Sequence, residues 1–163
     1  MSEPVSQYEL PAIGILENLP VEHRRMLASY GHFRFAGPSE TIIREGTPQN
    51  SLYLVISGTL HVKGRRGERE ILVARVRAGE CLGEVNVFDP ASASATVVAV
   101  DPTQLWHIDR DELEAFFSAY PDAAAALLIA IASLLSARLR SANAKLVDRI
   151  ETDTLIAEIQ STI

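Results

Sequence analysis

The chain is poor in cysteine, in positive charge and in long apolar runs. Its single cysteine, Cys81, excludes an internal disulfide and a multi-cysteine metal or iron–sulfur site. The formal net charge of -6 disfavours a generic binder of nucleic acid or anionic membrane, because both depend on a positive field. The longest mostly apolar run, residues 123–135, is too short to span a bilayer. The N-terminus has no basic-then-apolar leader, so we expect a cytoplasmic protein.

What the chain does contain is typical of one globular domain. It has 163 residues, of which 47% are hydrophobic and 22% are charged, and this length and composition suffice for a proper core. We expect three parts: an N-terminal tail over residues 1–12, a folded domain over residues 13–120, and a C-terminal helix with its tail over residues 121–163.

The middle of the chain has the period of short β-strands. Segments rich in β-branched or aromatic residues recur between residues 33 and 108, and glycine or proline turns separate them. The expected strands cover residues 33–35, 41–44, 51–56, 59–63, 70–76, 94–100 and 104–108. Their spacing predicts a mainly β fold, a β jelly roll (double-stranded β-helix) with flanking helices.

Helical patterns lie on both sides of the strands. Apolar residues between positions 13 and 30 fit helical turns that Pro20 interrupts. Asp109 precedes an acidic first turn and is the expected N-cap of another helix. Pro121 can begin a last helix, which neither Gly nor Pro interrupts from residue 122 to residue 163.

Apolar residues on this last helix recur at steps of three or four and form one stripe. Two interpretations are open: the stripe packs on its own domain, or it pairs two subunits. Because the stripe is longer than a small barrel can cover, we favour a homodimer. The expected interface residues are Leu128, Ile131, Leu135, Leu139, Leu146 and Ile150.

The most specific motif runs from residue 79 to residue 88 and is followed by an Ala-rich and Ser-rich segment over residues 91–99. It consists of Gly79-Glu80-Cys81-Leu82-Gly83-Glu84-Val85-Asn86-Val87-Phe88. The motif resembles the phosphate-binding cassette of cyclic-nucleotide-binding domains, in which a Gly-Glu pair opens a short helix and a later Arg pairs with the cyclic phosphate. Here Gly83 and Glu84 are present, but the position of the Arg falls on Ala93. Arg44-Glu45-Gly46 and residues 51–60 fit the same family, so the resemblance extends over about residues 19–149.

The residue types of the cassette define what it can bind. Free N–H groups at the start of the expected short helix, residues 84–88, favour an anion, and Glu84 can accept hydrogen bonds from a ribose hydroxyl. An Arg would pair two phosphate oxygens, which Ala93 cannot do, so we expect weakened binding of a cyclic nucleotide or other small anion. The expected ligand-binding residues are Gly83, Glu84, Val85, Asn86, Ser92, Ala93, Ser94 and Thr96.

Other candidate residues have simpler interpretations. Cys81 is expected to be a small buried residue and not a reactive thiol. The four histidines show no metal-ligand spacing, so we expect no metal. A basic run on the last helix is expected to be a solvated face, because acidic residues follow and cancel its field. This run contains Arg138, Arg140, Lys145 and Arg149.

These observations favour a non-enzymatic regulatory or sensory module that dimerises through its C-terminal helix. The main alternative is a ligand-free module for dimerisation and protein interaction. A cupin-type metalloenzyme is disfavoured, because such an enzyme needs a cluster of metal ligands and the sequence shows no such spacing. In relatives of the catabolite-activator type, a winged helix-turn-helix follows the long helix. This chain ends at residue 163 and has a net charge of -6, so we expect no direct DNA binding. The short apolar run and the negative charge also lead us to expect no membrane association.

Overall fold

The structure is a computed structural model that describes residues 8–161. Its helical elements are η1 (Gly14–Leu16), α1 (Val21–Tyr30), α2 (Arg110–Ala119) and α3 (Pro121–Ser161). Its strands are β1 (His32–Ala36), β2 (Thr41–Ile43), β3 (Pro48–Gln49), β4 (Ser51–Ser57), β5 (Thr59–Arg66), β6 (Arg69–Arg77), β7 (Cys81–Leu82), β8 (Ala91–Ser92), β9 (Thr96–Ala99) and β10 (Thr103–Asp109). Residues 1–7 of the expected tail lie outside the described residues, and Leu10 is already buried in the core.

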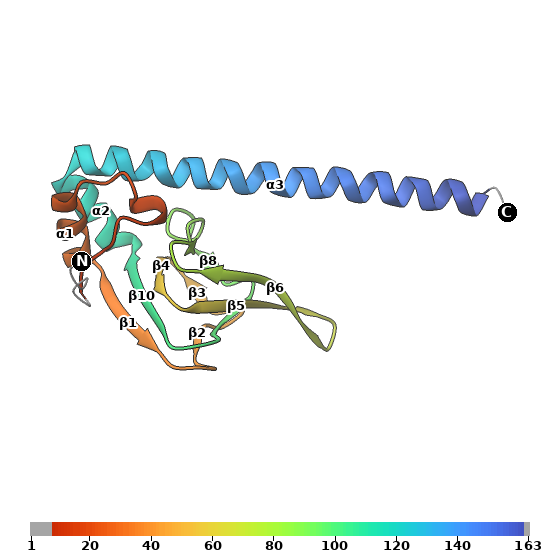
Figure 1. Ribbon diagram of the computed structural model, residues 1–163, viewed down its shortest axis with the longest axis horizontal. Coiled ribbons are helices and arrows are strands. Elements are labelled where there is room, and N and C mark those ends of the chain that lie inside the picture. The colour runs from red at the N-terminus through yellow and green to blue at the C-terminus, as the bar shows by residue number, and fades with distance from the viewer. Residues whose placement is uncertain (1–7, 162–163) are drawn as a thin grey trace, which may run out of the picture.

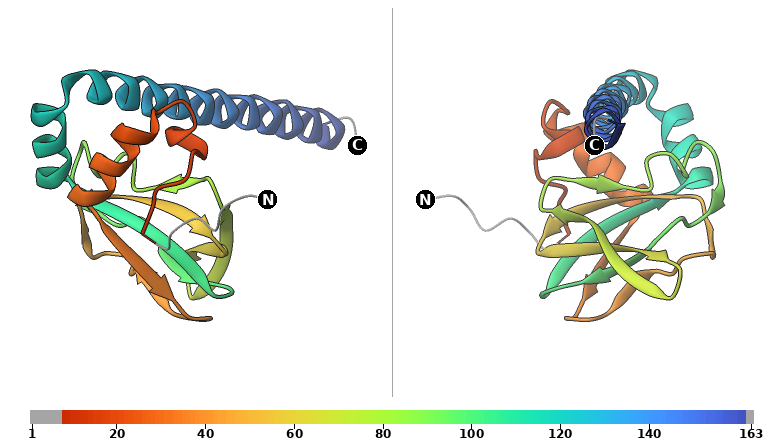
Figure 2. Two further views of the ribbon diagram at one scale, coloured as in Figure 1. Left: turned by 60° about the vertical axis from the view of Figure 1, so that its left-hand side comes forward. Right: turned by 90° about the vertical axis from the view of Figure 1, so that its right-hand side faces the viewer.

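The strands form two antiparallel four-stranded sheets packed face to face. One sheet has the order β1-β10-β4-β7, the other has the order β2-β9-β5-β6, and β3 pairs with β8 in a short ribbon. Most neighbours in these sheets are distant in sequence, as where β10 lies between β1 and β4. The arrangement confirms the predicted jelly roll, with the helices gathered at one end of it (Figure 2).

Strand β4 contributes side chains to two hydrophobic cores, one on each of its faces. Leu52 and Leu54 belong to the cluster between the sheet and the helices, whereas Tyr53 and Val55 belong to the cluster between the two sheets. Successive side chains of a strand point to opposite faces, so a strand covered on both faces needs apolar residues at every position. Residues 52–55 are accordingly all buried.

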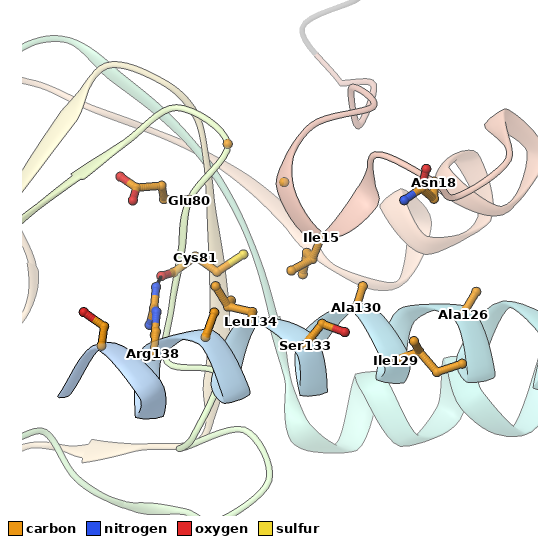
Figure 3. A pocket seen from close by; sticks show the side chains of 14 residues that line it. Ile15, Asn18, Glu80, Cys81, Ala126, Ile129, Ala130, Ser133, Leu134 and Arg138 are labelled. Atoms are coloured by element: carbon orange, nitrogen blue, oxygen red, sulfur yellow. Dashed lines mark hydrogen bonds between the residues drawn. The ribbon is translucent and has the colours of Figure 1, made fainter. Parts of the chain in front are cut away.

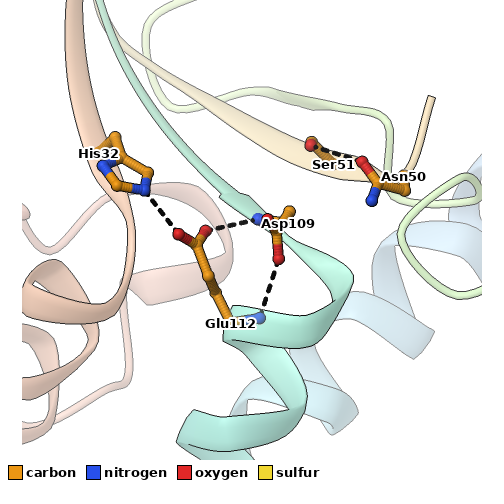
Figure 4. A network of polar contacts seen from close by, with 5 residues as sticks. All are labelled: His32, Asn50, Ser51, Asp109 and Glu112. Carbon is orange, nitrogen blue, oxygen red and sulfur yellow. Dashed lines mark hydrogen bonds and ion pairs between the residues drawn. The ribbon is translucent and has the colours of Figure 1, made fainter. Parts of the chain in front are cut away.

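Helix α2 begins where the last strand ends, at a complete capping box (Figure 4). The backbone N–H of Glu112 donates to the Asp109 carboxylate at 2.9 Å, and the Asp109 N–H donates to the Glu112 carboxylate at 3.0 Å. This geometry confirms the predicted N-cap at Asp109. Nε2 of His32 lies 2.5 Å from the other oxygen of Glu112, which ties the start of β1 to the same helix turn.

Helix α3 is 41 residues long and only its first part lies on the roll. Ala123, Leu127 and Ile131 are buried against α1, α2 and the first sheet, whereas the later turns extend away from the roll (Figure 1). By length and composition alone α3 could cross a membrane, since an 18-residue window of it has a mean hydropathy of 1.7. Core helices of globular proteins pass the same test, and part of this helix is packed in the core, so the indication of a membrane span is weak.

Replacing Asp109 by Ala should lower the free energy of unfolding by about 1 kcal/mol, because the first turn of α2 loses its cap. Ser118→Ala, at an exposed position of the same helix, should change it by less than about 0.5 kcal/mol. Denaturant unfolding followed by circular dichroism measures both variants. Equal losses would show that the capping box does not stabilise the helix beyond an ordinary surface residue.

Candidate functional site

The cassette is the part of the chain that crosses from one sheet of the roll to the other. It begins at β7, which pairs with β4 in the first sheet, and it ends at β9 in the second sheet. Between them, residues 83–89 were expected to contain a short helix over residues 84–88. The structure has an irregular turn there instead.

The hydrogen bonds of this turn explain why no helix forms. The N–H groups of Val87 and Asp89 donate to the carbonyls four residues earlier, at 3.0 and 2.8 Å, but Phe88 donates to Val85, three residues earlier, at 3.1 Å. A helix needs consecutive bonds of one kind. The expected pull of a helix N-terminus on an anion is therefore weaker than the sequence indicated.

Gly83 is required by the backbone at the start of this turn. Its φ is +79°, in the left-handed region that favours glycine, and an added Cβ would collide with the carbonyl oxygen of Ser51 in β4. The glycine therefore lets the cassette lie directly against the neighbouring strand.

Four of the expected ligand residues line one small cavity inside the roll. Its volume is about 130 Å³, and its lining residues are Ile43, Gln49, Val62, Leu82, Gly83, Asn86, Ala93, Ser94, Ala95 and Val97. None of these ten residues carries a charge. Pockets for drug-sized ligands are usually about 300–1,000 Å³, so the cavity is small for a nucleotide in this conformation.

Ala93 is buried at the wall of this cavity. Its N–H donates to the carbonyl of Thr47 and its carbonyl accepts from the N–H of Gly46, both at 2.8 Å. The backbone groups of Ala93 are thus already bonded, and its side chain is a methyl group. Ala93 therefore brings no cation to the position at which the resemblance expects an arginine.

The remaining expected residues do not share the cavity. Val85 is 54% exposed, and Ser92 is exposed at the end of β8. The Thr96 hydroxyl accepts a hydrogen bond from the N–H of Glu45 at 3.1 Å, so it stabilises the neighbouring turn.

Glu84, the carboxylate of the cassette, is buried and bound by a residue of helix α3. One of its oxygens accepts a hydrogen bond from the Arg138 guanidinium in an ion pair, and the other has no hydrogen-bond partner among the described residues. The same guanidinium donates to the carbonyl of Cys81 at 2.6 Å. The sequence interpretation placed Arg138 on a solvated face. Its side chain is 42% exposed, but its ion pair with Glu84 was not predicted.

The sequence contained a signal for this contact. Leu127, Ile131, Leu134 and Arg138 follow one another at steps of four, three and four, so Arg138 continues the face of α3 that packs on the roll. Arg140, Lys145 and Arg149 are exposed, as expected for a solvated face.

Cys81 is the small buried residue that the sequence indicated. It is 1% exposed, and burial, together with the negative charge of Glu84, raises the pKa of its thiol to about 12. The thiol is thus protonated near neutral pH, which makes it a poor nucleophile.

A larger groove, which the sequence analysis did not identify, lies between η1, residues 79–81 and helix α3 (Figure 3). Its volume is about 750 Å³, and most of its lining consists of small or apolar side chains such as Ile15, Ala130 and Leu134. Arg138 lies on α3 beside Cys81 at one end of the groove. The groove is therefore bounded on one side by the first residues of the cassette motif and at one end by Arg138.

The expected interface residues of α3 fall into two groups. Leu128, Leu139, Leu146 and Ile150 are 40% to 63% exposed, so they are available to a partner. Ile131 is not available, because it is 1% exposed in the core of its own domain. Its assignment to the interface was therefore wrong. On this turn of α3, the face packed on the roll lies next to the face exposed to solvent. Leu135 is half-buried against the same core.

His107 lies in a packing contact with an aromatic ring. His107 stacks on the ring of Tyr53, with 5.3 Å between centroids, and burial followed by the nearby His32 lowers the pKa of His107. Within residues 8–161, no three side chains of His, Cys, Asp or Glu are grouped so that they could hold a metal ion.

Comparison with known proteins agrees with this geometry. The family model of the cyclic nucleotide-binding domain matches residues 33–120. The CRP-like cAMP-activated global transcriptional regulator of Mycobacterium tuberculosis is 32% identical over 69% of this chain and 49% of its own. The catabolite activator protein of Thermus thermophilus has a TM-score of 0.72 and 29% identity over 82% of this chain and 61% of its own. A cyclic nucleotide-binding domain from Methylobacillus flagellatus has a TM-score of 0.74 and 28% identity over 84% of this chain and 78% of its own.

The chain therefore belongs to the cyclic-nucleotide-binding domain family. The matched residues run through the roll to the end of α2, so helix α3 and Arg138 lie beyond them. The chain spans about half the length of the Mycobacterium tuberculosis regulator, whose matching part is 49% of its chain.

Gly83→Ala should destabilise the protein more than Gly67→Ala does. Both glycines have a positive φ, which costs an alanine about 1–2 kcal/mol, but only at Gly83 would the new Cβ also meet a backbone oxygen. This clash should add about 1–3 kcal/mol to the loss of unfolding free energy. Chemical denaturation of both variants makes the comparison, and equal losses would mean that the cassette need not lie close to β4.

Proposed function

We propose that this chain is a non-enzymatic regulatory module in which cyclic-nucleotide binding is weakened, because Ala93 stands where the family has its phosphate-pairing arginine. The observation that carries the proposal is the uncharged lining of the cavity at Ala93. A cyclic phosphate placed there would lose water without gaining a cation, which is costly for a charged group.

The expected loss of affinity for a cyclic nucleotide follows from the missing hydrogen bonds to its phosphate. Each bond to a charged group contributes about 1.5–3 kcal/mol, so a missing bidentate pair weakens binding by about two to four orders of magnitude. The irregular turn over residues 84–88 provides little compensation, since it lacks a regular helix N-terminus. We propose that cyclic AMP and cyclic GMP bind with dissociation constants in the high micromolar range or weaker.

The family's ribose site is the part of the cassette that we propose to be retained. The second oxygen of Glu84 is buried without a hydrogen-bond partner among the described residues. Such an acceptor is costly to leave unpaired, and a ligand hydroxyl would supply the missing donor. This orphan oxygen supports a residual ligand role for Gly83 and Glu84.

Helix α3 supports a homodimer as the working form. Beyond the roll it exposes large apolar side chains that monomeric proteins seldom leave in water. These side chains are Leu139, Leu146, Val147, Ile150, Leu155, Ile156 and Ile159. We propose that a second copy covers them and that the module works as a cytoplasmic signalling unit.

A ligand-free interaction module is the second candidate function. The observation in its favour is the small volume of the cavity, about 130 Å³, which would have to expand to admit a nucleotide. In that case the cassette would only stabilise the roll, and α3 would carry the function.

Ala93→Arg should raise the affinity for cyclic AMP by at least tenfold, or about 1.4 kcal/mol, because the substitution supplies the missing phosphate partner. Glu84→Ala in that background should remove much of the gain, since the ribose contact is lost with it. Isothermal titration calorimetry on the three proteins measures the affinities. Tight binding by the unsubstituted protein would contradict the proposed weakening, and no gain with Ala93→Arg would favour the ligand-free module.

Leu139→Glu combined with Leu146→Glu should convert the dimer to a monomer, because each change would bury an unpaired charge at the interface. Both positions are exposed in the single subunit, so the fold should be retained. Ser141→Glu combined with Ala144→Glu is the matched control, since it adds the same charge on the opposite side of the helix. Light scattering gives the mass of each protein, and an unsubstituted protein that is monomeric at high micromolar concentration would exclude the dimer.

A further inference from the structure

The second sheet of the roll has a free edge that neither the cassette nor helix α3 uses. Strand β6 is the last strand in the order β2-β9-β5-β6, and within residues 8–161 it pairs only with β5. All of its residues except Val76 are exposed. The β5–β6 hairpin projects from the roll, which leaves this edge open (Figure 1). We propose that an extended, acidic segment of a partner protein adds to β6 as a further strand.

The backbone of β6 is suited to strand addition. An edge strand presents unpaired N–H and C=O groups, and proteins usually protect such edges with short strands, prolines or bulges. The hairpin has one of these protections, a shift in register between Val62 and Lys63 of β5. Strand β6 itself is nine residues long and contains no proline. It can therefore pair with an extended segment along most of its length.

Positive charge is concentrated around this edge. Residues 59–77 contain six of the fifteen Lys and Arg residues of the chain but only two of its twenty-one Asp and Glu residues. Lys63 is paired with Glu70 at 2.9 Å. The arginines of this segment form no ion pair among the described residues, and they are Arg65, Arg66, Arg69, Arg75 and Arg77. Their unpaired charges favour a partner that carries carboxylates.

Apolar side chains lie between these arginines. Lys63 is opposite Leu72 and His61 is opposite Arg75 in the register of the hairpin. Opposite residues share a face of the sheet, as do alternate residues of one strand, so Leu72 and Arg75 lie on the same face. A segment that alternates apolar and acidic residues would therefore match this surface. The exposed apolar residues at the centre of β6 are Ile71, Leu72 and Val73.

Other occupants fit this edge less well. If two copies of β6 paired antiparallel about Val73, Arg69 of one copy would lie opposite Arg77 of the other, and like charges directly opposite are destabilising. A bilayer would meet the tip of the hairpin, residues 66–69, which is charged and holds its apolar residues away from the lipid. A nucleic acid has no peptide backbone to pair with a strand, and the net charge of -6 opposes a long polyanion.

Binding of a synthetic peptide to the full chain tests the proposal. The probe alternates Glu and Val and has nine residues, the length of β6. The control peptide has Lys in place of each Glu. In fluorescence anisotropy the Glu peptide should bind about tenfold more tightly or better at low salt, and added salt should reduce the difference because it screens the arginines. Equal affinities, or no binding of either peptide, would overturn the proposal.

Two double variants test where the Glu peptide binds. Arg75→Glu combined with Arg77→Glu should weaken its binding about tenfold, because both charges at one end of β6 are reversed. Arg140→Glu combined with Arg149→Glu is the matched control, since it changes the net charge equally at exposed positions of α3 and should leave the affinity within about twofold. Equal losses in the two variants would show that only the net charge matters, which would contradict a site at β6.

Hydrogen exchange of the unsubstituted protein tests strand addition itself. With the Glu peptide bound, amide exchange should slow in residues 69–77, because a new strand pairs the free amides of β6. Peptide binding without this protection would overturn strand addition.

The rival occupants are tested on the same proteins. The probes are a thymidine oligonucleotide and vesicles of equal parts phosphatidylcholine and phosphatidylserine, and neither should bind as tightly as the Glu peptide. Light scattering should give one mass for the unsubstituted protein and for the variant with Glu at positions 75 and 77. Tighter binding of the oligonucleotide or the vesicles, or a change of mass without a change in peptide affinity, would assign the edge to a different occupant and overturn the proposal.

Discussion

A buried carboxylate needs a cation or several hydrogen-bond donors, and in this protein the cation comes from outside the roll. Glu84 obtains it from Arg138 on α3, and the same guanidinium binds the Cys81 carbonyl. Removing either member of such a pair leaves the other unpaired, which is strongly unfavourable when the group is buried. This contact therefore joins the cassette to a helix whose first part is already packed in the core.

The distribution of charge around the cassette distinguishes this chain from the family pattern. In the proposed function, Glu84 is the anionic half of the ligand site, and the methyl group of Ala93 stands at the position of the cationic half. The Arg138 guanidinium pairs with the carboxylate, on the side of the turn that faces α3. A second guanidinium, that of Arg110, donates to the Phe88 carbonyl at 2.9 Å. With a net charge of -6, the protein as a whole also does not attract an anion. We therefore propose that the module responds weakly to nucleotides and that the helix has the larger part in signalling.

The fold could be predicted because its signals are local. Each long strand carries its own β-branched or aromatic run, and Asp109 marks the start of α2. Strands β3, β7 and β8 have two residues each and were missed, since so short a segment has no period. The helix expected over residues 84–88 is a turn because its hydrogen bonds alternate between two spacings. Ile131 was assigned to the dimer face because the apolar stripe of α3 contains both residues that pack on the roll and residues that are exposed to solvent.

The candidate site was harder to predict, because its key contact is not local. Counting along the motif that begins at Gly83 assigned Ala93 to the expected ligand site, and Ala93 lines the small cavity. The partner of Glu84 could not be counted in this way, since it depends on how α3 crosses the roll. A charged residue in register with buried ones, as Arg138 is with Leu127 and Ile131, was the available signal.

The most direct test is a crystal structure of the Ala93→Arg protein with cyclic AMP. The account predicts that the ribose hydroxyls contact Glu84 and that the guanidinium introduced at position 93 pairs with the phosphate. A nucleotide bound away from both positions would contradict it.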